Sequence, residues 1–288
     1  MENAIEIKDF SKKYNLFSIK NMNLNIPRGY ITGFVGKNGA GKSTTLKAIL
    51  NMIKMDNGKI SILGREMKDA EIELKNQIGA VFGEDGYIDD MTLINFSKIV
   101  SSMYENWDSK AFDGYIKEFG LPLSQKISEL SKGMRVKFSI TLALSHNAEL
   151  FIMDEPTAGL DPIVRDEILE IFMRLIQDEK KTILFSTHIT SDLDKISDFI
   201  VLIDNGEIIF NTSKDELIDS HKRIKGKKSL LDTALKDAMV DYQENENSFV
   251  GLVSNFDLLK NYPDLIIEKP NVEDIMLFYI RGKNHELD

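Results

Sequence analysis

The segment that most constrains the fold is an apolar run that leads into a glycine-rich loop. Residues 30–35 (YITGFV) predict a strand, and Gly36–Ser43 read GKNGAGKS. A helical apolar pattern then continues through Leu46, Ile49 and Ile53. This order of strand, loop and helix matches the pattern GxxxxGK[ST], whose backbone N–H groups surround a phosphate. We therefore expect a layered α/β fold with an anion site at this loop.

Glycines let the loop wind closely around a phosphate, and the following helix offers its positive N-terminal end to the anion. Lys42 is expected to reach the β- and γ-phosphate oxygens, and the Ser43 hydroxyl to ligate Mg²⁺. A turn that merely joins strand to helix is the alternative. The loop alone does not distinguish an ATPase from a GTPase or a kinase. The expected phosphate-contacting residues are Gly36, Lys37, Asn38, Gly39, Ala40, Gly41, Lys42, Ser43 and Thr44.

A second segment, Leu150–Glu155 (LFIMDE), predicts a buried strand that ends in two carboxylates. In a parallel sheet these acids lie at the carboxyl edge, where the phosphate loop also opens. Asp154 is suited to hold Mg²⁺ through water, and Glu155 to polarise an attacking water. The alternative is a strand end with solvated acids, which the presence of the glycine-rich loop disfavours.

Composition excludes several classes of function. The net charge is −10 and the pI about 5.1, which disfavours a nucleic-acid partner because phosphate-backbone binders usually have surplus basic residues. The chain has no cysteine, so it forms no disulfide or thiolate metal site. The N-terminus lacks a signal-peptide pattern, and no apolar run reaches the ~18 residues that span a bilayer. Any membrane role must therefore involve a partner.

The pattern of strands and helices divides the chain. Residues 1–220 alternate strands and helices around a mostly helical stretch at about 92–145, and residues 221–288 predict a small accessory module. The basic run at 221–228 (HKRIKGKK) is expected to be a solvated linker, with a lipid or partner contact as the alternative. The aromatic residues Trp107, Phe112, Tyr115 and Phe119 are expected to form the core of the helical stretch.

Further motifs follow in a characteristic order. Residues 130–134 read LSKGM, residues 156–161 read PTAGLD after Glu155, and His188 follows the strand pattern LFST at 184–187. These motifs resemble those of the ABC transporter ATP-binding cassette, whose signature is usually LSGGQ. LSKGM is similar to a variant found in one exporter branch. The resemblance covers about residues 3–220. It implies an α/β P-loop NTPase fold: a RecA-like core, an antiparallel β subdomain and a helical insertion, here followed by a small C-terminal α+β module.

The resemblance also implies roles for individual residues. Ser131 and Gly133 would contact the γ-phosphate of a nucleotide bound by a second cassette, with Asp161 in the adjoining D-loop. His188 would sense the γ-phosphate, and Tyr14 would stack on adenine. Two positions depart from the family pattern. Glu84 (or Gly83) replaces the Q-loop glutamine that contacts Mg²⁺, and Lys37 replaces a common proline, where it either adds positive potential or lies in water.

The interpretation is an ATP-binding and ATP-hydrolysing subunit that uses Mg²⁺, with Lys42, Glu155 and His188 as catalytic residues. The resemblance implies a second cassette, identical or paralogous, and a separate transmembrane permease at the cytoplasmic face of the membrane. The cargo class would be peptides, antibiotics or other amphipathic compounds. The alternatives are a soluble ABC ATPase that acts on ribosomes or DNA, and a regulator without effective hydrolysis. The single phosphate loop and the short segment between Lys42 and Ser131 disfavour the former, and Glu155 and His188 the latter.

Overall fold

The computed structural model describes residues 2–68, 70–82 and 87–285. Its centre is a six-stranded sheet in which only the edge strand β10 is antiparallel to its neighbour. Parallel strands covered on both faces are apolar along their whole length, as the runs at 150–153 and 199–203 are. In sheet order the strands are β10 (Glu207–Ser213), β9 (Phe199–Asp204), β3 (Ile31–Val35), β8 (Thr182–Thr187), β7 (Leu150–Asp154) and β6 (Ile78–Phe82).

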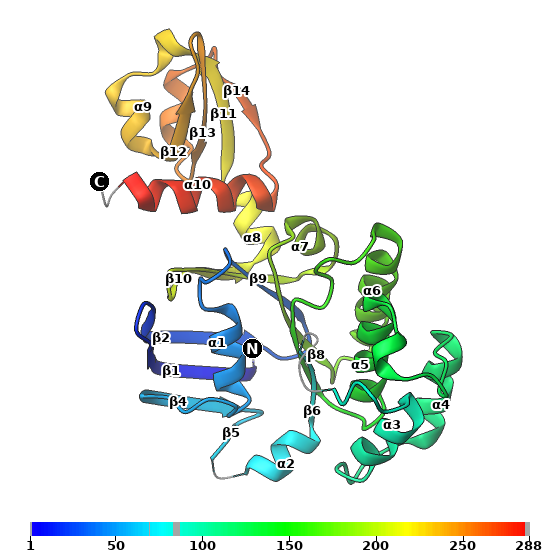
Figure 1. Ribbon diagram of the computed structural model, residues 1–288. Coiled ribbons are helices and arrows are strands. Elements are labelled where there is room, and N and C mark those ends of the chain that lie inside the picture. Colours follow the sequence, from blue (N-terminus) through cyan, green and yellow to red (C-terminus); the bar gives the residue numbers. More distant parts are fainter. Residues whose placement is uncertain (1, 69, 83–86, 286–288) are drawn as a thin grey trace.

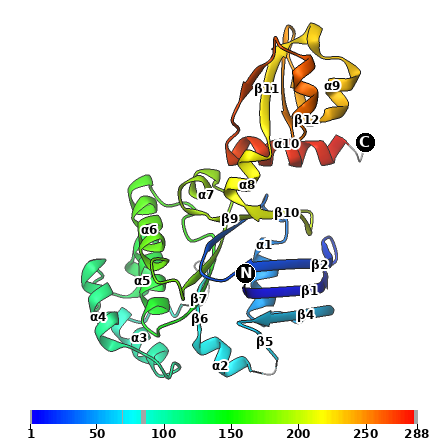
Figure 2. The ribbon, with the colours of Figure 1, turned by 180° about the vertical axis from the view of Figure 1, so that it is seen from behind.

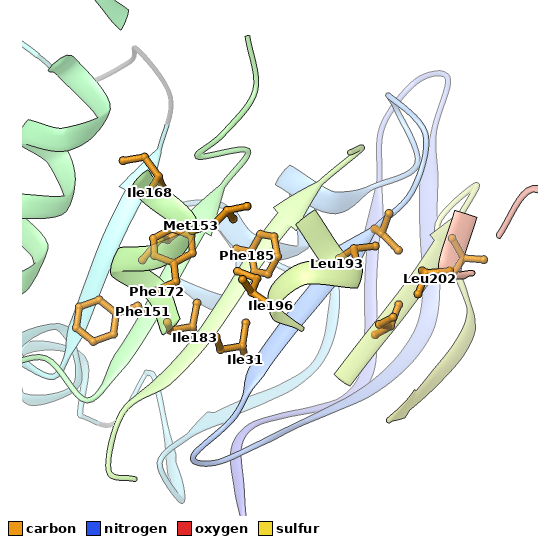
Figure 3. Close-up of a cluster of buried hydrophobic side chains, with 14 of the residues drawn as sticks. Ile31, Phe151, Met153, Ile168, Phe172, Ile183, Phe185, Leu193, Ile196 and Leu202 are labelled. Atoms are coloured by element: carbon orange, nitrogen blue, oxygen red, sulfur yellow. The ribbon is translucent and has the colours of Figure 1, made fainter. Parts of the chain in front are cut away.

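Successive residues of these strands enter two different cores. On β8, Ile183 and Phe185 join one cluster and Leu184 joins the other, because neighbouring strand residues face opposite sides of a sheet. Figure 3 shows the first cluster, in which Phe151, Phe172 and Phe185 lie between the strands and the helices. This double burial fixes the register of the strands that carry the candidate site.

One face of the sheet carries α1 (Lys42–Ile49) and a four-stranded antiparallel sheet (Figures 1 and 2). A short helix, α2 (Glu71–Asn76), leads from this region into β6. The strands of the antiparallel sheet are β2 (Ser18–Pro27), β1 (Asn3–Lys13), β4 (Asn57–Ile62) and β5 (Arg65–Glu66), in that order. The fold is that of a P-loop NTPase with an antiparallel β subdomain, as the sequence predicted.

The helical insertion lies between β6 and β7 and has a hydrophobic cluster of its own. Phe112 is buried in this cluster, with Trp107 and Phe119 packed against it. Tyr115 instead packs against the main core. The insertion consists of α3 (Leu93–Ser101), α4 (Ser109–Glu118), the short 3₁₀ turn η1 (Ile127–Glu129) and α5 (Lys132–Leu144), and after β7 the chain continues with α6 (Pro162–Leu175), α7 (Thr190–Ile196) and α8 (Lys214–Asp219).

The C-terminal part forms a second four-stranded antiparallel sheet above the cassette (Figure 1). Its long helix α10 (Val272–His285) lies between this sheet and α7 and α8. The sheet order is β12 (Met239–Glu244), β13 (Ser248–Val253), β11 (Lys222–Lys227) and β14 (Ile266–Glu268), with η2 (Lys228–Leu230), α9 (Thr233–Ala238) and η3 (Asp257–Asn261) in the connections.

The linker prediction for residues 221–228 was wrong, because most of this basic run is the interior strand β11. Its positive charges are balanced by acids from distant segments. Glu268 pairs with Arg223 and Lys225, and Glu244 pairs with Lys228. Ile224 is fully buried in the core of the module. The run therefore belongs to a folded sheet that its local composition does not reveal.

Candidate active site

The site is built at the carboxyl ends of β3, β8 and β7, which are adjacent in the sheet. The register pairs Val35 with Thr187 and Asp154 with Ser186. The segments that follow these strands therefore begin side by side. They are the glycine-rich loop after β3, His188 after β8 and Glu155 after β7, which are three of the motifs that the sequence singled out.

The glycine-rich loop has backbone angles that glycine adopts readily. Gly39 has φ +81° and Gly41 φ +114°, in the left-handed region that other residues adopt at a cost. A Cβ on Gly41 would lie 2.9 Å from the Phe17 ring, and one on Gly36 would lie 2.3 Å from the carbonyl oxygen of Ile203. The loop is therefore held closely against its neighbours, and α1 begins directly after it at Lys42.

The Lys42 ammonium is the centre of the site. The residue is only 5% exposed, and its Nζ donates to the carbonyl oxygens of Gly36 at 2.7 Å and Lys37 at 3.3 Å. It also lies 3.3 Å from Glu155 Oε1. A buried ammonium requires such partners because desolvation of a charge is costly. The arrangement places one fixed positive charge beside the loop's backbone N–H groups.

Glu155 connects Lys42 to His188. Its Oε2 lies 2.6 Å from Nδ1 of His188. An ionised carboxylate only accepts hydrogen bonds, so Nδ1 of His188 carries the hydrogen. Glu155 also has φ +51°, a strained conformation for a residue with a side chain, of a kind that clusters at functional sites. Its backbone N–H donates to Ser186 Oγ at 2.9 Å, which holds the strained residue in place.

Asp154 lies beside this pair and is held by the same serine. Ser186 Oγ donates to Asp154 Oδ1 at 2.5 Å. Sequence reasoning missed Ser186, although its place at the end of an apolar strand next to His188 was a usable signal. Asp154 and Glu155 both border a cavity of about 320 Å³ between the sheet and α5, which Lys47, Lys132 and Arg135 also line.

A cavity of about 330 Å³ opens over the glycine-rich loop. Most of the predicted phosphate-contacting residues line it, and Gly36 and Ala40 belong to the same loop. The aromatic side chain in the lining is Phe17, whereas Tyr14 is not among the lining residues and instead lies 5.5 Å from the Lys12 ammonium. Sequence reasoning did not single out Phe17. The lining comprises Phe17, Lys37, Asn38, Gly39, Gly41, Lys42, Ser43, Thr44 and Glu155.

Ser131, Gly133 and Asp161 are not among the residues that line that cavity. Ser131 caps α5, since its Oγ accepts from the N–H of Met134 at 3.2 Å, and Asp161 caps α6 by accepting from two N–H groups at 3.1 Å. A Cβ on Gly133 would lie 2.9 Å from a Val164 methyl carbon, so a larger residue at this position would have to displace the Val164 side chain. Glu84 and Gly83 lie outside the described residues.

Two buried histidines take part in structural contacts away from the site. His146 follows α5, and its Nε2 lies 3.1 Å from the carbonyl oxygen of Ile78, whereas His221 bonds to the Tyr279 hydroxyl at 2.9 Å. Burial lowers the pKa of each imidazole below its ordinary value. Within the described residues, no group of three or more His, Cys, Asp or Glu side chains is arranged to hold a metal ion.

Comparison with known proteins shows similarity to ATP-binding proteins of ABC transporters. The family model described as ABC transporter matches residues 19–158. The chain is 33% identical over 73% of its length to the ABC transporter ATP-binding protein NatA of Bacillus subtilis, 88% of which is covered. It is also 33% identical over 75% of its length to the bacitracin transport ATP-binding protein BcrA of Bacillus licheniformis, 72% of which is covered.

Solved structures agree with the sequence relatives. A structure described as the ATP-binding subunit of an ABC transporter superposes with a TM-score of 0.66 at 28% identity, covering 75% of this chain and 92% of the other. Both comparisons match about three quarters of the chain. None of the described helices combines the length and apolar character that a bilayer span requires.

Proposed function

Because this chain belongs to the family of ABC transporter ATP-binding proteins, we propose that it binds ATP and hydrolyses it in the cavity above the glycine-rich loop. One observation carries the proposal. Lys42, Glu155 and His188 come from three separate segments, yet they form a continuous chain of contacts, of which Lys42 and Glu155 line that cavity. A phosphate-binding loop alone would bind an anion. The Glu155 carboxylate beside this loop could in addition orient a water molecule for attack on the phosphate.

The chemistry follows from these positions. The backbone N–H groups of the loop and the Lys42 ammonium would neutralise the phosphate oxygens as charge moves during transfer. Glu155 would accept a hydrogen bond from the attacking water and so orient it. His188 holds one oxygen of that carboxylate through Nδ1 and leaves the other oxygen directed at Lys42. An incoming triphosphate would compete with Glu155 for the lysine, which would free the carboxylate to meet water.

The residues present fit Mg²⁺. Within the described parts of the chain the Ser43 hydroxyl has no protein hydrogen-bond partner, and Asp154 is fixed by Ser186. A hydroxyl and a carboxylate are hard oxygen donors, and Mg²⁺ usually takes few protein ligands together with water and substrate phosphate. Ser43 and Asp154 would hold the ion, which would supply charge neutralisation at the phosphates. Glu84 remains a proposed further oxygen ligand.

The active unit would contain two cassettes, identical or paralogous. Ser131 and Gly133 do not line the chain's own nucleotide cavity, so they would meet a nucleotide only when it is held by a second cassette. The start of α5 would then present its N–H groups to the γ-phosphate, with Asp161 nearby. A two-fold arrangement would complete both sites together. Tyr14 would stack on adenine, with Phe17 as a second aromatic neighbour.

The cassette pair would drive a separate transmembrane permease from the cytoplasmic face of the membrane. BcrA is named for bacitracin transport, which supports a cargo of peptides, antibiotics or other amphipathic compounds. We propose that this cargo is moved outward. No nucleic-acid partner is proposed, in line with the acidic balance of the chain.

The proposal is tested in two steps. Purified chain should bind ATP in a magnesium-dependent manner and release phosphate; absence of both at millimolar nucleotide would refute the enzymatic part. Co-expression with a candidate transmembrane permease should then retain the chain in the membrane fraction. Hydrolysis by a chain that never associates with a membrane protein would leave an ATPase but exclude the transport role.

A further inference from the structure

A larger hollow lies at the other end of the sheet. It measures about 880 Å³ and is bordered by the start of α4, the end of α5 and the end of α6. Phe151 in its lining is near the amino end of β7, whereas Asp154 ends that strand. Three residues of extended strand span about 10 Å, so this hollow is separate from the nucleotide cavity.

The hollow joins two parts of the molecule. Trp107 and Tyr115 come from the helical insertion, while Phe151, Leu175 and Lys181 come from the core around the six-stranded sheet. A molecule bound here would touch both parts and would stabilise the arrangement that they have in this structure. None of the proposed nucleotide-contacting residues takes part in the lining.

The lining combines aromatic surface with a few polar groups, as small-molecule sites do. Trp107, Tyr115 and Phe151 supply aromatic rings, and Leu144 and Leu175 supply aliphatic surface. Flat aromatic ligands pack well against such rings. The helical stretch was expected to use Trp107 and Tyr115 only as core, but both are partly exposed.

Lys181 supplies the polar anchor. Its Nζ donates to the carbonyl oxygen of Ala148 at 2.7 Å and to Oδ1 of Asn147 at 3.0 Å. An ammonium has three donors, and these contacts account for two. Among the described residues no third acceptor contacts the Lys181 ammonium, so its remaining donor can bind a ligand. The side chain is held in place by both partners, so little entropy is lost when it binds a further acceptor.

The charges around the hollow favour an anion. Asp108 is in the lining, but its Oδ1 already accepts from the N–H groups of Lys110 and Ala111 as the cap of α4. In the lining, Lys110 and Lys181 stand against the single acid Asp108. Beyond the lining, Glu149 and Asp178 attract Lys181 and Lys180 repels it. Because Glu149 already pairs with Arg28 at 2.6 Å, these groups together keep one positive charge in excess. A ligand with one negative group would balance the excess.

We propose that this hollow is a binding site for a planar aromatic compound with one anionic group, held between the helical insertion and the sheet with its anion on Lys181. The site is distinct from the nucleotide cavity, with which it shares no lining residue.

Trp107 is the only tryptophan of the chain, so its fluorescence reports on this hollow directly. The probe is anilinonaphthalenesulfonate, an aromatic anion that accepts energy from indole. N-phenylnaphthylamine, which lacks the sulfonate, is the neutral match. We expect saturable one-site binding with energy transfer from Trp107. The sulfonate should bind about tenfold more tightly than the neutral probe, the size of one charge-assisted hydrogen bond.

Three variants locate the probe. Lys181→Met should lower the affinity for the sulfonate to that for the neutral probe. Lys180→Met removes the same charge from the exposed neighbouring residue and should change nothing. Ala111→Phe fills the hollow from α4 and should weaken both probes about tenfold or more, whereas Ala111→Ser should not. Thermal unfolding of each variant confirms that it is folded.

Several results would overturn the proposal. They are the absence of saturable binding, equal losses in Lys180→Met and Lys181→Met, or unchanged binding in Ala111→Phe. Displacement of the probe by magnesium and ATP, with Ala111→Phe unaffected, would place the probe in the nucleotide cavity and would also refute the proposal. Should Lys181→Met fail to fold, the comparison of probe binding by Ala111→Phe and Ala111→Ser tests whether the probe occupies this hollow.

Discussion

At the scale of single residues, Glu155 is the carboxylate on which hydrolysis should depend most. It lies between Lys42 and His188, and its backbone is held in a strained conformation. Glu155→Gln keeps the size of the side chain but weakens its power to accept a proton from water. We expect turnover to fall by about 10²–10³-fold, a few kcal/mol of transition-state stabilisation. ATP binding should be retained, as measured by equilibrium titration beside a phosphate-release assay.

Glu170→Gln is the matched control, because Glu170 is exposed on α6. It should hydrolyse ATP like the unchanged protein. Normal turnover in Glu155→Gln would remove Glu155 from the catalytic role and leave His188 or an undescribed residue to orient the water.

Lys42 should act on binding rather than on turnover alone. Its ammonium is buried and already faces two carbonyl oxygens of the phosphate loop, so Lys42→Ala removes the fixed positive charge of the cavity. We expect the affinity for ATP to fall about 10- to 100-fold, the range of one hydrogen bond to a charged group. Lys54→Ala, at an exposed position, should leave the affinity unchanged. Equal affinities of Lys42→Ala and the unchanged protein would contradict the proposed cavity.

His146 should make the stability of the fold depend on pH. Its two ring nitrogens lie 3.2 Å and 3.1 Å from the carbonyl oxygens of Leu142 and Ile78, and burial lowers its pKa below the ordinary 6.5. The unfolded chain therefore takes up a proton at a higher pH than the folded one. As pH falls below 6.5, the free energy of unfolding should decrease until the folded pKa is reached.

Urea unfolding at a series of pH values measures this effect. His146→Gln does not titrate, and it should reduce the slope of the unfolding free energy by up to about one proton. An unchanged slope would assign the pH dependence to another group. His221, whose pKa is also lowered by burial, would be the first to examine.

The residues of the site differed in how far sequence could predict them. Lys42 and Glu155 each belong to a motif whose residues are consecutive in the chain. The sequence pattern alone was therefore enough to predict that both lie at one cavity. Phe17 and Ser186 act through packing and strand register, which involve partners far away in sequence. The roles of Tyr14, Ser131, Gly133 and Asp161 concern a bound nucleotide and a second cassette, and they stay predictions.

At the scale of secondary-structure elements, the start of α5 has two separable functions. Ser131 caps the helix through Met134, and it is also the residue proposed to meet a second cassette's nucleotide. Ser131→Ala should lower the free energy of unfolding by about 1 kcal/mol through loss of the cap and should also reduce hydrolysis. Ser131→Asn keeps a capping acceptor, so it should restore stability but not hydrolysis.

Denaturant unfolding and phosphate release distinguish these effects. Recovery of full hydrolysis in Ser131→Asn would mean that Ser131 acts only as a cap. Hydrolysis that stays low while stability is regained would support the proposed contact with the nucleotide of a second cassette.

The element that sequence reasoning misread was β11. A run of lysine and arginine predicts a solvated segment when only neighbouring residues are considered. The partners that neutralise it, Glu244 and Glu268, lie on β12 and β14. The topology of the sheet decides which acids lie beside these lysines and arginines. The partners therefore cannot be predicted from the sequence of the run itself. By contrast, the strands of the central sheet are apolar throughout, and their burial on both faces follows from composition alone.

At the scale of the whole molecule, the C-terminal module and the cassette share a hydrophobic core. Val272, Ile275 and Phe278 of α10 belong to the same buried cluster as Leu193 of α7 and Leu217 of α8. Lys269 also pairs with Asp219, and His221 bonds to Tyr279. A continuous core predicts that the two parts unfold together, so that a change at their junction affects the cassette as well.

Tyr279→Ala tests this junction. The Tyr279 ring packs edge-on against Phe210 of β10 at 5.5 Å and accepts or donates a hydrogen bond with His221. Loss of the Tyr279 ring should lower the free energy of unfolding by about 2–4 kcal/mol, as for other large-to-small changes of packed aromatics, and should separate the unfolding of the module from that of the cassette.

Tyr242→Ala, on β12 within the module's own cluster, is the control, and it should destabilise the chain while leaving one unfolding transition. Calorimetry that finds a single transition in both variants, with equal losses, would mean that cooperativity does not depend on the α10 contact. Two transitions in the unchanged protein would show that the module folds independently despite the shared core.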